Sequence, residues 1–361
     1  MINGYCFSIR VANLDIRGAR RGGLRGQPRN HLHAPSARRR LRATRGFNGL
    51  VDAPDRDPDR APDPDRDPDP DRDPAADPRV AAYLARLGRP DLRGAPADRA
   101  TLVALHRAHV ERVPYETLQI ALGRPPAVDA DSSVASVLRG QGGYCFHLNG
   151  AFAWLLSRLG YAVQHHRAGV QGARAVEPVG ADGNHLALTV DLAGQPWLVD
   201  VGLGSALHDP VPLVPGRYRQ GPFDYGVRRS DVVPGGWRFD HDLSADSFAG
   251  MDWEARGCTL AEATTRHTEL STSPDSMFVT VLAVQRRDAH GVDLLRSVSL
   301  MRIDAAGRRE RVLEGPADFE GVLRGVFGLD LTGMPGEQLA AVWRQQADRY
   351  AAYQTNKTAR A

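Results

Sequence analysis

The spacing of apolar residues predicts helices in one part of the chain and strands in the next. Between residues 80 and 160, apolar side chains recur every three or four positions, which is typical of helices with one buried face. After Gly160 the period falls to two, in segments rich in Val and Leu that Gly and Pro interrupt. The order is therefore helices, then strands, then a mixed α/β segment.

Helices are expected at residues 81–88, 98–113, 132–140 and 144–160, and later at 317–328 and 335–353. The second of these begins after Asp98, a favourable N-cap residue, and ends before Pro114, which cannot continue a helix. The first ends at Gly88, a residue type that commonly terminates helices. The first four helices predict a small helical bundle.

Strands are expected at residues 161–170, 185–192 and 196–202, with a further strand pair at 276–287 and 296–304. Ala193-Gly194 is expected to be the turn between the second and third strands. With a two-residue turn, the numbers of cross-strand partners sum to 387, so that Asp200 faces Ala187 on the same sheet face as His185. A three-residue loop would instead put the two side chains on opposite faces.

Charge is distributed unevenly along the 361 residues. Residues 1–50 carry a net charge of +10, and residues 51–80, with eleven Asp, five Arg and eight Pro, carry −6. Such a composition cannot bury enough surface to fold, so we expect residues 1–78 to be a disordered basic arm and an acidic, proline-rich linker. Since the total is +3, residues 81–361 carry −1. A nucleic-acid-binding tail is disfavoured, because the arm has no binding motif and few aromatic residues.

Composition otherwise indicates a globular protein, with 42% hydrophobic and 25% charged residues. Three cysteines cannot form a disulfide framework, which favours a reducing compartment. No apolar run is long enough to span a membrane or to form the core of a signal peptide. We therefore expect a cytoplasmic protein without membrane partners.

Cys145 has the sequence setting of a nucleophile. It follows Gly142, Gly143 and Tyr144 and opens a predicted helix, where the positive end of the helix dipole favours a thiolate and free amides could hold an oxyanion. A buried structural cysteine is the alternative that position alone leaves open. Cys6, in the arm, and Cys258, in a segment expected to be a loop, have no such setting.

A thiolate nucleophile needs a base, and the base needs a group that orients it. His185 and Asp200 on the predicted hairpin are the candidates, although each could also be a structural residue. His147 is a poor partner for Cys145, because helix positions two apart do not face each other. His165 and His166 show no metal-ligand spacing, so no metal is expected.

These residues resemble the arylamine N-acetyltransferase family, whose pattern is R-G-G-x-C-x-E-x-N, then H-x-x-L-x-V, then D-V-G-F-G. The matching segments here are 141–149, 185–190 and 200–204, with further similarity at 104–118 and 273–278. The resemblance covers roughly residues 80–350 and leaves the arm outside it.

The resemblance implies an α+β architecture of several parts with a Cys-His-Asp arrangement like that of cysteine proteases. Its parts would be a helical bundle at 79–160 with the cysteine, an antiparallel β-barrel at 161–270 with the histidine and aspartate, and an α/β lid at 271–361. It also implies a ping-pong reaction. Cys145 would take an acetyl group from acetyl-CoA as a thioester, an aromatic amine or hydrazine would then attack it, His185 would shuttle protons and Asp200 would orient His185.

By position, the resemblance further implies that Tyr115, Leu203 and Phe278 line the acceptor pocket and that Gly202, Leu203 and Gly204 lie close to the coenzyme. Two residues depart from the pattern, because Gln141 replaces its Arg and His147 its Glu. If those two residues pair in relatives, this chain has lost both partners together, which strands no charge.

Other functions remain open on the sequence. An amide synthase that closes a macrolactam from a polyketide thioester would use the same chemistry. A cysteine hydrolase or transglutaminase-like enzyme could use the same three residues, and a non-catalytic binding protein would fit the departures at Gln141 and His147.

Overall fold

The computed structural model describes residues 74–245 and 247–358. The expected disorder of the arm and linker therefore falls almost entirely outside the described residues. At its end, however, residues 74–76 form a 3₁₀ turn (η1, Pro74–Ala76) and a helix begins at Pro78. The ordered part thus starts a few residues earlier than expected.

The first region is helical, as predicted, with a core between the helices. The elements are α1 (Pro78–Arg86), η2 (Pro90–Leu92), α2 (Arg99–Arg112), α3 (Leu118–Ala121), α4 (Ala130–Leu138) and α5 (Cys145–Arg158). Aspartate side chains accept hydrogen bonds from backbone N–H groups at the N-termini of α1, α2 and α4. Because Asp129 caps α4, that helix begins two residues before Ser132, where its start was expected. The short helix α3 was not expected. Tyr83, Leu105 and Phe152 are fully buried in the shared core.

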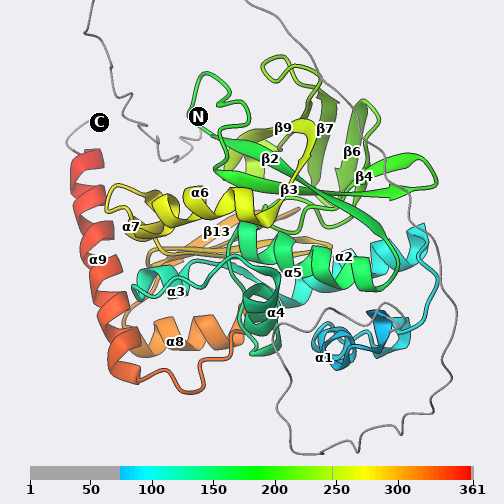
Figure 1. Ribbon diagram of the computed structural model, residues 1–361. Helices are drawn as coiled ribbons and strands as arrows, with labels where there is room; N and C mark the ends of the chain where they lie inside the picture. The colour runs from blue at the N-terminus through cyan, green and yellow to red at the C-terminus, as the bar shows by residue number, and fades with distance from the viewer. Residues whose placement is uncertain (1–73, 246, 359–361) are drawn as a thin grey trace, which may run out of the picture. The chain divides into compact units, whose positions relative to one another are not determined.

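An antiparallel eight-stranded sheet, curved like a barrel, follows the helices in the order β5-β4-β3-β2-β9-β8-β7-β6. Its strands are β2 (Ala162–Gly172), β3 (His185–Leu192), β4 (Gln195–Leu198), β5 (Val211–Pro212), β6 (Gly216–Gln220), β7 (Phe223–Arg229), β8 (Trp237–Asp240) and β9 (Phe248–Cys258), with a 3₁₀ turn η3 (Leu243–Ala245) before β9. Figure 1 shows this sheet above helices α5 and α2.

The predicted register of the β3-β4 hairpin is confirmed. Thr189 pairs with Leu198 and Val190 with Trp197, and each pair of numbers sums to 387. Ala193 and Gly194 both have positive φ, at 52° and 85°, as a type I′ turn requires. The strand itself ends at Leu198, so Asp200 lies two residues beyond it rather than at its end.

Three local predictions in the later chain were wrong. Cys258 is the last residue of β9, not part of a loop. Helix α6 (Leu260–Thr272) lies inside the segment expected to be all β. Phe278 belongs to a short helix, α7 (Met277–Thr280), because Ser276 caps it and accepts the backbone N–H of Phe278.

A second sheet, of five strands, has the order β1-β10-β11-β12-β13. These strands are β1 (Tyr115–Glu116), β10 (Ala283–Asp288), β11 (Gly291–Arg296), β12 (Ser299–Asp304) and β13 (Gly307–Val312). The two expected strands, β10 and β12, are not direct partners, because β11 lies between them. The edge strand β1 comes from the helical region and joins it to this sheet.

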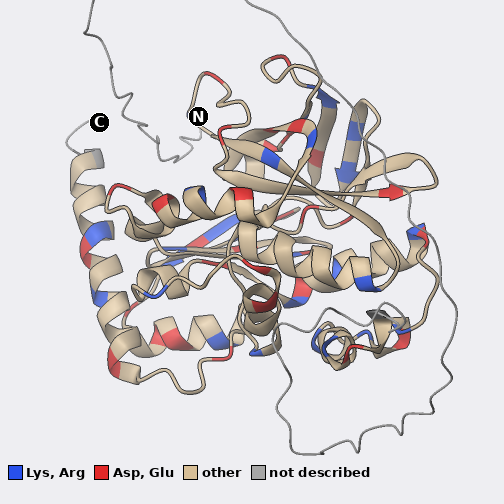
Figure 2. Cartoon of the chain, viewed as in Figure 1, with Lys and Arg blue, Asp and Glu red and all other residues tan. Residues whose placement is uncertain are grey.

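Helices α8 (Pro316–Gly325) and α9 (Gly336–Thr358) complete the chain. One face of the five-stranded sheet packs on them through Leu295 and Phe319, and the other packs on the eight-stranded sheet through Leu294 and Met301. Acidic and basic residues are interspersed along the described elements (Figure 2). None of the helices in the described ranges is long and apolar enough to cross a membrane.

Candidate active site

Cys145 is the first residue of α5, as predicted, and follows a glycine turn that has no room for side chains. A Cβ on Gly142 would lie 1.9 Å from the carbonyl oxygen of Pro114. A Cβ on Gly202 would lie 2.7 Å from the Cα of Cys145, so the loop after β4 packs directly on the start of the helix. Glycine at these positions lets two distant segments meet at the cysteine.

His185 and Asp200 meet beside Cys145. The Nε2 atom of His185 and the Oδ2 atom of Asp200 are 2.7 Å apart, and the two side chains are 4% and 0% exposed. Cys145 lies close enough to the His185 ring to contribute to the raised pKa of that ring. Because Nε2 is engaged by Asp200, Nδ1 is the nitrogen available to the sulfur. The three residues singled out from the sequence therefore form one constellation.

The electrostatics of this group favour a charged imidazole. Burial alone would lower the pKa of His185, but the negative charge of Asp200 and the interaction with Cys145 outweigh it and raise the pKa to about 10. At neutral pH the ring is thus an imidazolium between two partners that can each carry a negative charge.

Asn149 anchors the aspartate, a contribution that the sequence analysis did not single out. Its side-chain nitrogen donates to Oδ1 of Asp200 at 2.9 Å, and its oxygen accepts the backbone N–H of Val201 at 2.9 Å. Asn149 stands four residues after Cys145, so the two share one face of α5. This four-residue spacing from Cys145 was the feature of the sequence that could have indicated Asn149 as part of the site.

The expected pocket residues separate into two groups. Tyr115 and Phe278 pack with Cys145 in one cluster, together with Tyr144 and Phe146. Leu203 lies instead in the core between the two sheets, and Gly204 packs against the side chain of Gln285 on β10. Cys145 is only 2% exposed, so these rings nearly cover the sulfur.

The other candidate residues have structural partners. The His147 side chain is directed at another partner than Cys145, since its Nε2 lies 3.2 Å from the carbonyl oxygen of Pro126. Burial lowers the pKa of His147 to about 4. His166 bonds Thr189 across the sheet. Cys6 lies outside the described residues, and burial raises the pKa of Cys258 to about 11.

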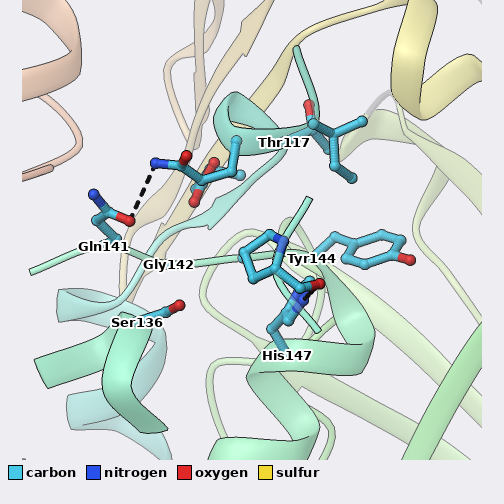
Figure 3. Close-up of a pocket in the computed structure, with 11 residues that line it drawn as sticks. Thr117, Ser136, Gln141, Gly142, Tyr144 and His147 are labelled. Atoms are coloured by element: carbon cyan, nitrogen blue, oxygen red, sulfur yellow. Dashed lines mark hydrogen bonds between the residues drawn. The ribbon is translucent and has the colours of Figure 1, made fainter. Parts of the chain in front are cut away.

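The two departures from the family pattern line one small cavity of about 10 Å³, shown in Figure 3. The side-chain oxygen of Gln141 accepts a hydrogen bond from Gln119 at 3.2 Å. The same cavity is lined by the carboxylate of Glu116, which is 4% exposed. Burial raises the pKa of Glu116 to about 7, although backbone N–H groups of Leu118, Gln119 and Gly142 oppose this. A buried carboxylate therefore lines the same cavity as Gln141, the position at which the family pattern has an arginine.

Comparison with known proteins identifies the family of this chain. A profile of the N-acetyltransferase family matches residues 98–335. An arylamine N-acetyltransferase of Mycolicibacterium smegmatis is 29% identical over 277 residues, which cover 73% of this chain and 96% of that protein. Proansamycin X synthase of Amycolatopsis mediterranei is 37% identical over 141 residues, which cover 38% of this chain and 53% of that protein.

Among solved structures, the arylamine N-acetyltransferase of Mycobacterium abscessus superimposes with a TM-score of 0.66 and 27% identity, covering 74% of this chain and 94% of that one. The matches extend from the helical region through both sheets. The chain belongs to the arylamine N-acetyltransferase family and is an acetyltransferase.

Proposed function

We propose that this protein transfers an acetyl group from acetyl-CoA to an arylamine or hydrazine by a ping-pong mechanism through an acetyl-cysteine thioester. The observation that carries the proposal is the buried group of Cys145, His185 and Asp200, in which the 2.7 Å contact holds the imidazole toward the sulfur. The membership in the family supports the acetyl donor and the amine acceptor.

In the first half-reaction the Cys145 thiolate attacks the carbonyl carbon of the donor thioester. The new sulfur–carbon bond forms on Cys145 and the bond to the coenzyme sulfur breaks. His185 gives its proton to the departing coenzyme thiolate and becomes neutral. The backbone N–H groups of Cys145 and Phe146 at the start of α5, where no side chain caps the helix, would stabilise the oxyanion that forms between these events.

In the second half-reaction the amine nitrogen attacks the acetyl-cysteine carbonyl. The nitrogen loses a proton to neutral His185, and the carbon–sulfur bond breaks to restore the thiolate and imidazolium. A weakly basic aromatic amine suits this step, because it is uncharged at neutral pH and its lone pair is available. Tyr115 and Phe278, which pack beside the sulfur, would contact the aromatic ring.

Intact mass after incubation with acetyl-CoA tests the first half-reaction. We expect the protein to gain one acetyl group, and the Cys145→Ser variant, which keeps the size of the side chain, to gain none. Addition of an aromatic amine should then remove the group from the wild-type protein. A folded wild-type protein that gains no mass would contradict the proposal.

An amide synthase is the second candidate, and the similarity to proansamycin X synthase, over about half of that protein, favours it. It would use the same thioester on Cys145 but would release the acyl group to an amine of the same molecule. Rapid turnover of acetyl-CoA with a simple aromatic amine would support acetyl transfer. Acylation without turnover of that amine would favour the synthase.

A further inference from the structure

Two buried polar side chains line the small cavity beside the nucleophile turn, the residues 142–144 that precede Cys145. The carboxylate of Glu116 and the imidazole of His147 both line this cavity, and the two residues are 4% and 3% exposed. Gln141 lies at the same cavity (Figure 3). The volume of about 10 Å³ is close to the space that one water molecule needs. The cavity therefore suits a single small, polar occupant.

The hydrogen-bonding state of His147 follows from its partner. Its Nε2 atom lies 3.2 Å from the carbonyl oxygen of Pro126, which can only accept, so Nε2 carries the hydrogen. Burial keeps the ring neutral at pH 7, because it lowers the pKa to about 4. Nδ1 therefore presents a lone pair, and no group in the described part of the chain donates to it. A buried acceptor of this kind is a site for an ordered water.

Glu116 supplies the second partner for such a water. Its carboxylate accepts the backbone N–H of Leu118, which leaves further lone pairs on the two oxygens. A water in the cavity can donate one hydrogen to Nδ1 of His147 and the other to this carboxylate. When the carboxyl group is protonated, the same water accepts its hydrogen. The bridge is therefore compatible with both states of Glu116.

Both of these residues pack against the glycines of the nucleophile turn. A Cβ on Gly142 would lie 3.2 Å from the Cγ of Glu116, and a Cβ on Gly143 would lie 2.6 Å from the Cβ of His147. The backbone N–H of Glu116 also donates to the carbonyl oxygen of Gly143 at 2.9 Å. The turn is thus held both by β1, which contains Glu116, and by the first turn of α5, which contains His147.

We propose that this cavity binds one ordered water that bridges Nδ1 of His147 and the carboxyl group of Glu116, and that the two bridged residues are positioning residues for Cys145. The family pattern has Arg and Glu at positions 141 and 147, whereas Gln141 is uncharged in this chain and His147 is neutral. The bridge therefore joins β1 to α5 without an ion pair to position 141. This inference rests on the proposed role of Cys145 as the nucleophile.

Two substitutions at His147 separate the roles of its two nitrogens. In His147→Asn, the side-chain oxygen takes the place of Nδ1 as an acceptor, and the contact with Pro126 is lost. In His147→Gln, the longer amide takes the place of Nε2 at Pro126, and the acceptor toward the cavity is lost. We expect the maximal rate of Cys145 acetylation by p-nitrophenyl acetate, measured as the burst of p-nitrophenol, to be about tenfold lower in His147→Gln than in His147→Asn. The half-saturating ester concentration should be similar in the two variants, because positioning affects bond formation rather than binding.

A crystal structure at high resolution tests the water itself. We expect electron density for one water within hydrogen-bond distance, about 2.7 to 3.2 Å, of both Nδ1 of His147 and a carboxylate oxygen of Glu116. The His147→Asn variant should keep this water and the His147→Gln variant should lose it. A wild-type cavity without water density, or equal burst rates in the two variants, would overturn the proposal.

His166 provides the matched control, because it is 4% exposed and bonds Thr189 rather than a group of the nucleophile turn. Asn and Gln at position 166 should give equal burst rates. A tenfold difference between them as well would show that the effect is general to buried histidines and would count against the bridge.

Alkylation of Cys145 by iodoacetamide separates this inference from the proposed function, since it needs neither an acetyl donor nor an amine. Slower alkylation in His147→Gln than in His147→Asn supports the positioning role even if no acetyl group is transferred. Equal alkylation in the two variants, together with normal acetylation of the wild-type protein, overturns the positioning role and leaves the proposed function standing.

Discussion

Asp200 is held by donors on both of its oxygens. Oδ2 contacts Nε2 of His185, while Oδ1 accepts hydrogen bonds from Asn149 and, at 2.8 Å, from the backbone of Gly202. The side chain is fully buried, so these partners replace water around the charge. The carboxylate therefore fixes the direction of the imidazole and holds the His185 pKa high at the same time.

The substitution Asp200→Asn removes the negative charge of the side chain but keeps its shape. It should therefore show the effect of that charge on His185 without a change in packing. Without the carboxylate the pKa of His185 falls from about 10, and a larger share of the ring is neutral at pH 7. The thiolate then loses its counterion. We expect alkylation of Cys145 by iodoacetamide at pH 7 to slow at least tenfold and acetyl transfer to fall by roughly 10³ or more.

The variant Glu177→Gln, which removes one carboxylate from an exposed bend eight residues before His185, serves as the control. It should react like the wild-type protein. Equal alkylation rates in Asp200→Asn and wild type across pH 6 to 9 would show that Asp200 does not set the charge of the pair.

At the scale of single elements, the β3-β4 hairpin carries the base to the nucleophile, and its turn fixes the register. Ala193 is one of two non-glycine residues with positive φ among those described, and an L-residue with a Cβ is strained there. The N–H of Gly194 donates to the Asp191 side chain at 2.8 Å. The turn therefore forms despite a small amount of backbone strain at Ala193.

Ala193→Asn should stabilise the protein, because Asn tolerates positive φ and Asn-Gly is the preferred type I′ sequence. We expect a gain of roughly 0.5 to 1 kcal/mol in the free energy of unfolding, measured with urea, and unchanged acetylation. Gly194→Ala, at φ 85°, should cost about 1 kcal/mol. Destabilisation by Ala193→Asn would show that the turn conformation does not limit stability.

The same hairpin shows why part of the site was predictable. A two-residue turn and a period-two pattern are local signals, and together they placed His185 and Asp200 on one face. The capping box of Thr259 and Glu262 is a local signal for the start of α6, although no helix was expected there. By contrast, α7 has four residues, too few for a periodic pattern. Strand β1 has two residues and depends on pairing with β10, more than 160 positions away.

At the scale of the whole molecule, Glu116 stands where the helical region, the five-stranded sheet and the start of α5 meet. It pairs with Val284 of β10, and its N–H donates to the carbonyl oxygen of Gly143 at 2.9 Å. Its carboxylate accepts the backbone N–H of Leu118. The titratable side chains near it are His147, which is neutral at pH 7, and the tyrosines Tyr115 and Tyr144, whose pKa values burial raises so that neither is charged. A charge on Glu116 therefore lies where the helical region, the five-stranded sheet and the start of α5 are in contact.

This position predicts how the stability of the molecule depends on pH. The pKa of Glu116 is about 7 in the folded protein and 4.5 when exposed, so the folded state holds a proton that unfolding releases between those values. The contribution of Glu116 to the free energy of unfolding should therefore fall as pH rises from 4.5 to 7, by an amount on the order of 3 kcal/mol, and should be level above that range. Glu116→Gln should lack this component, and Gln141→Arg should reduce it by placing a cation in the same cavity. Urea unfolding at pH 5 and pH 8 measures the difference, and an identical difference in wild type and both variants would contradict the assignment.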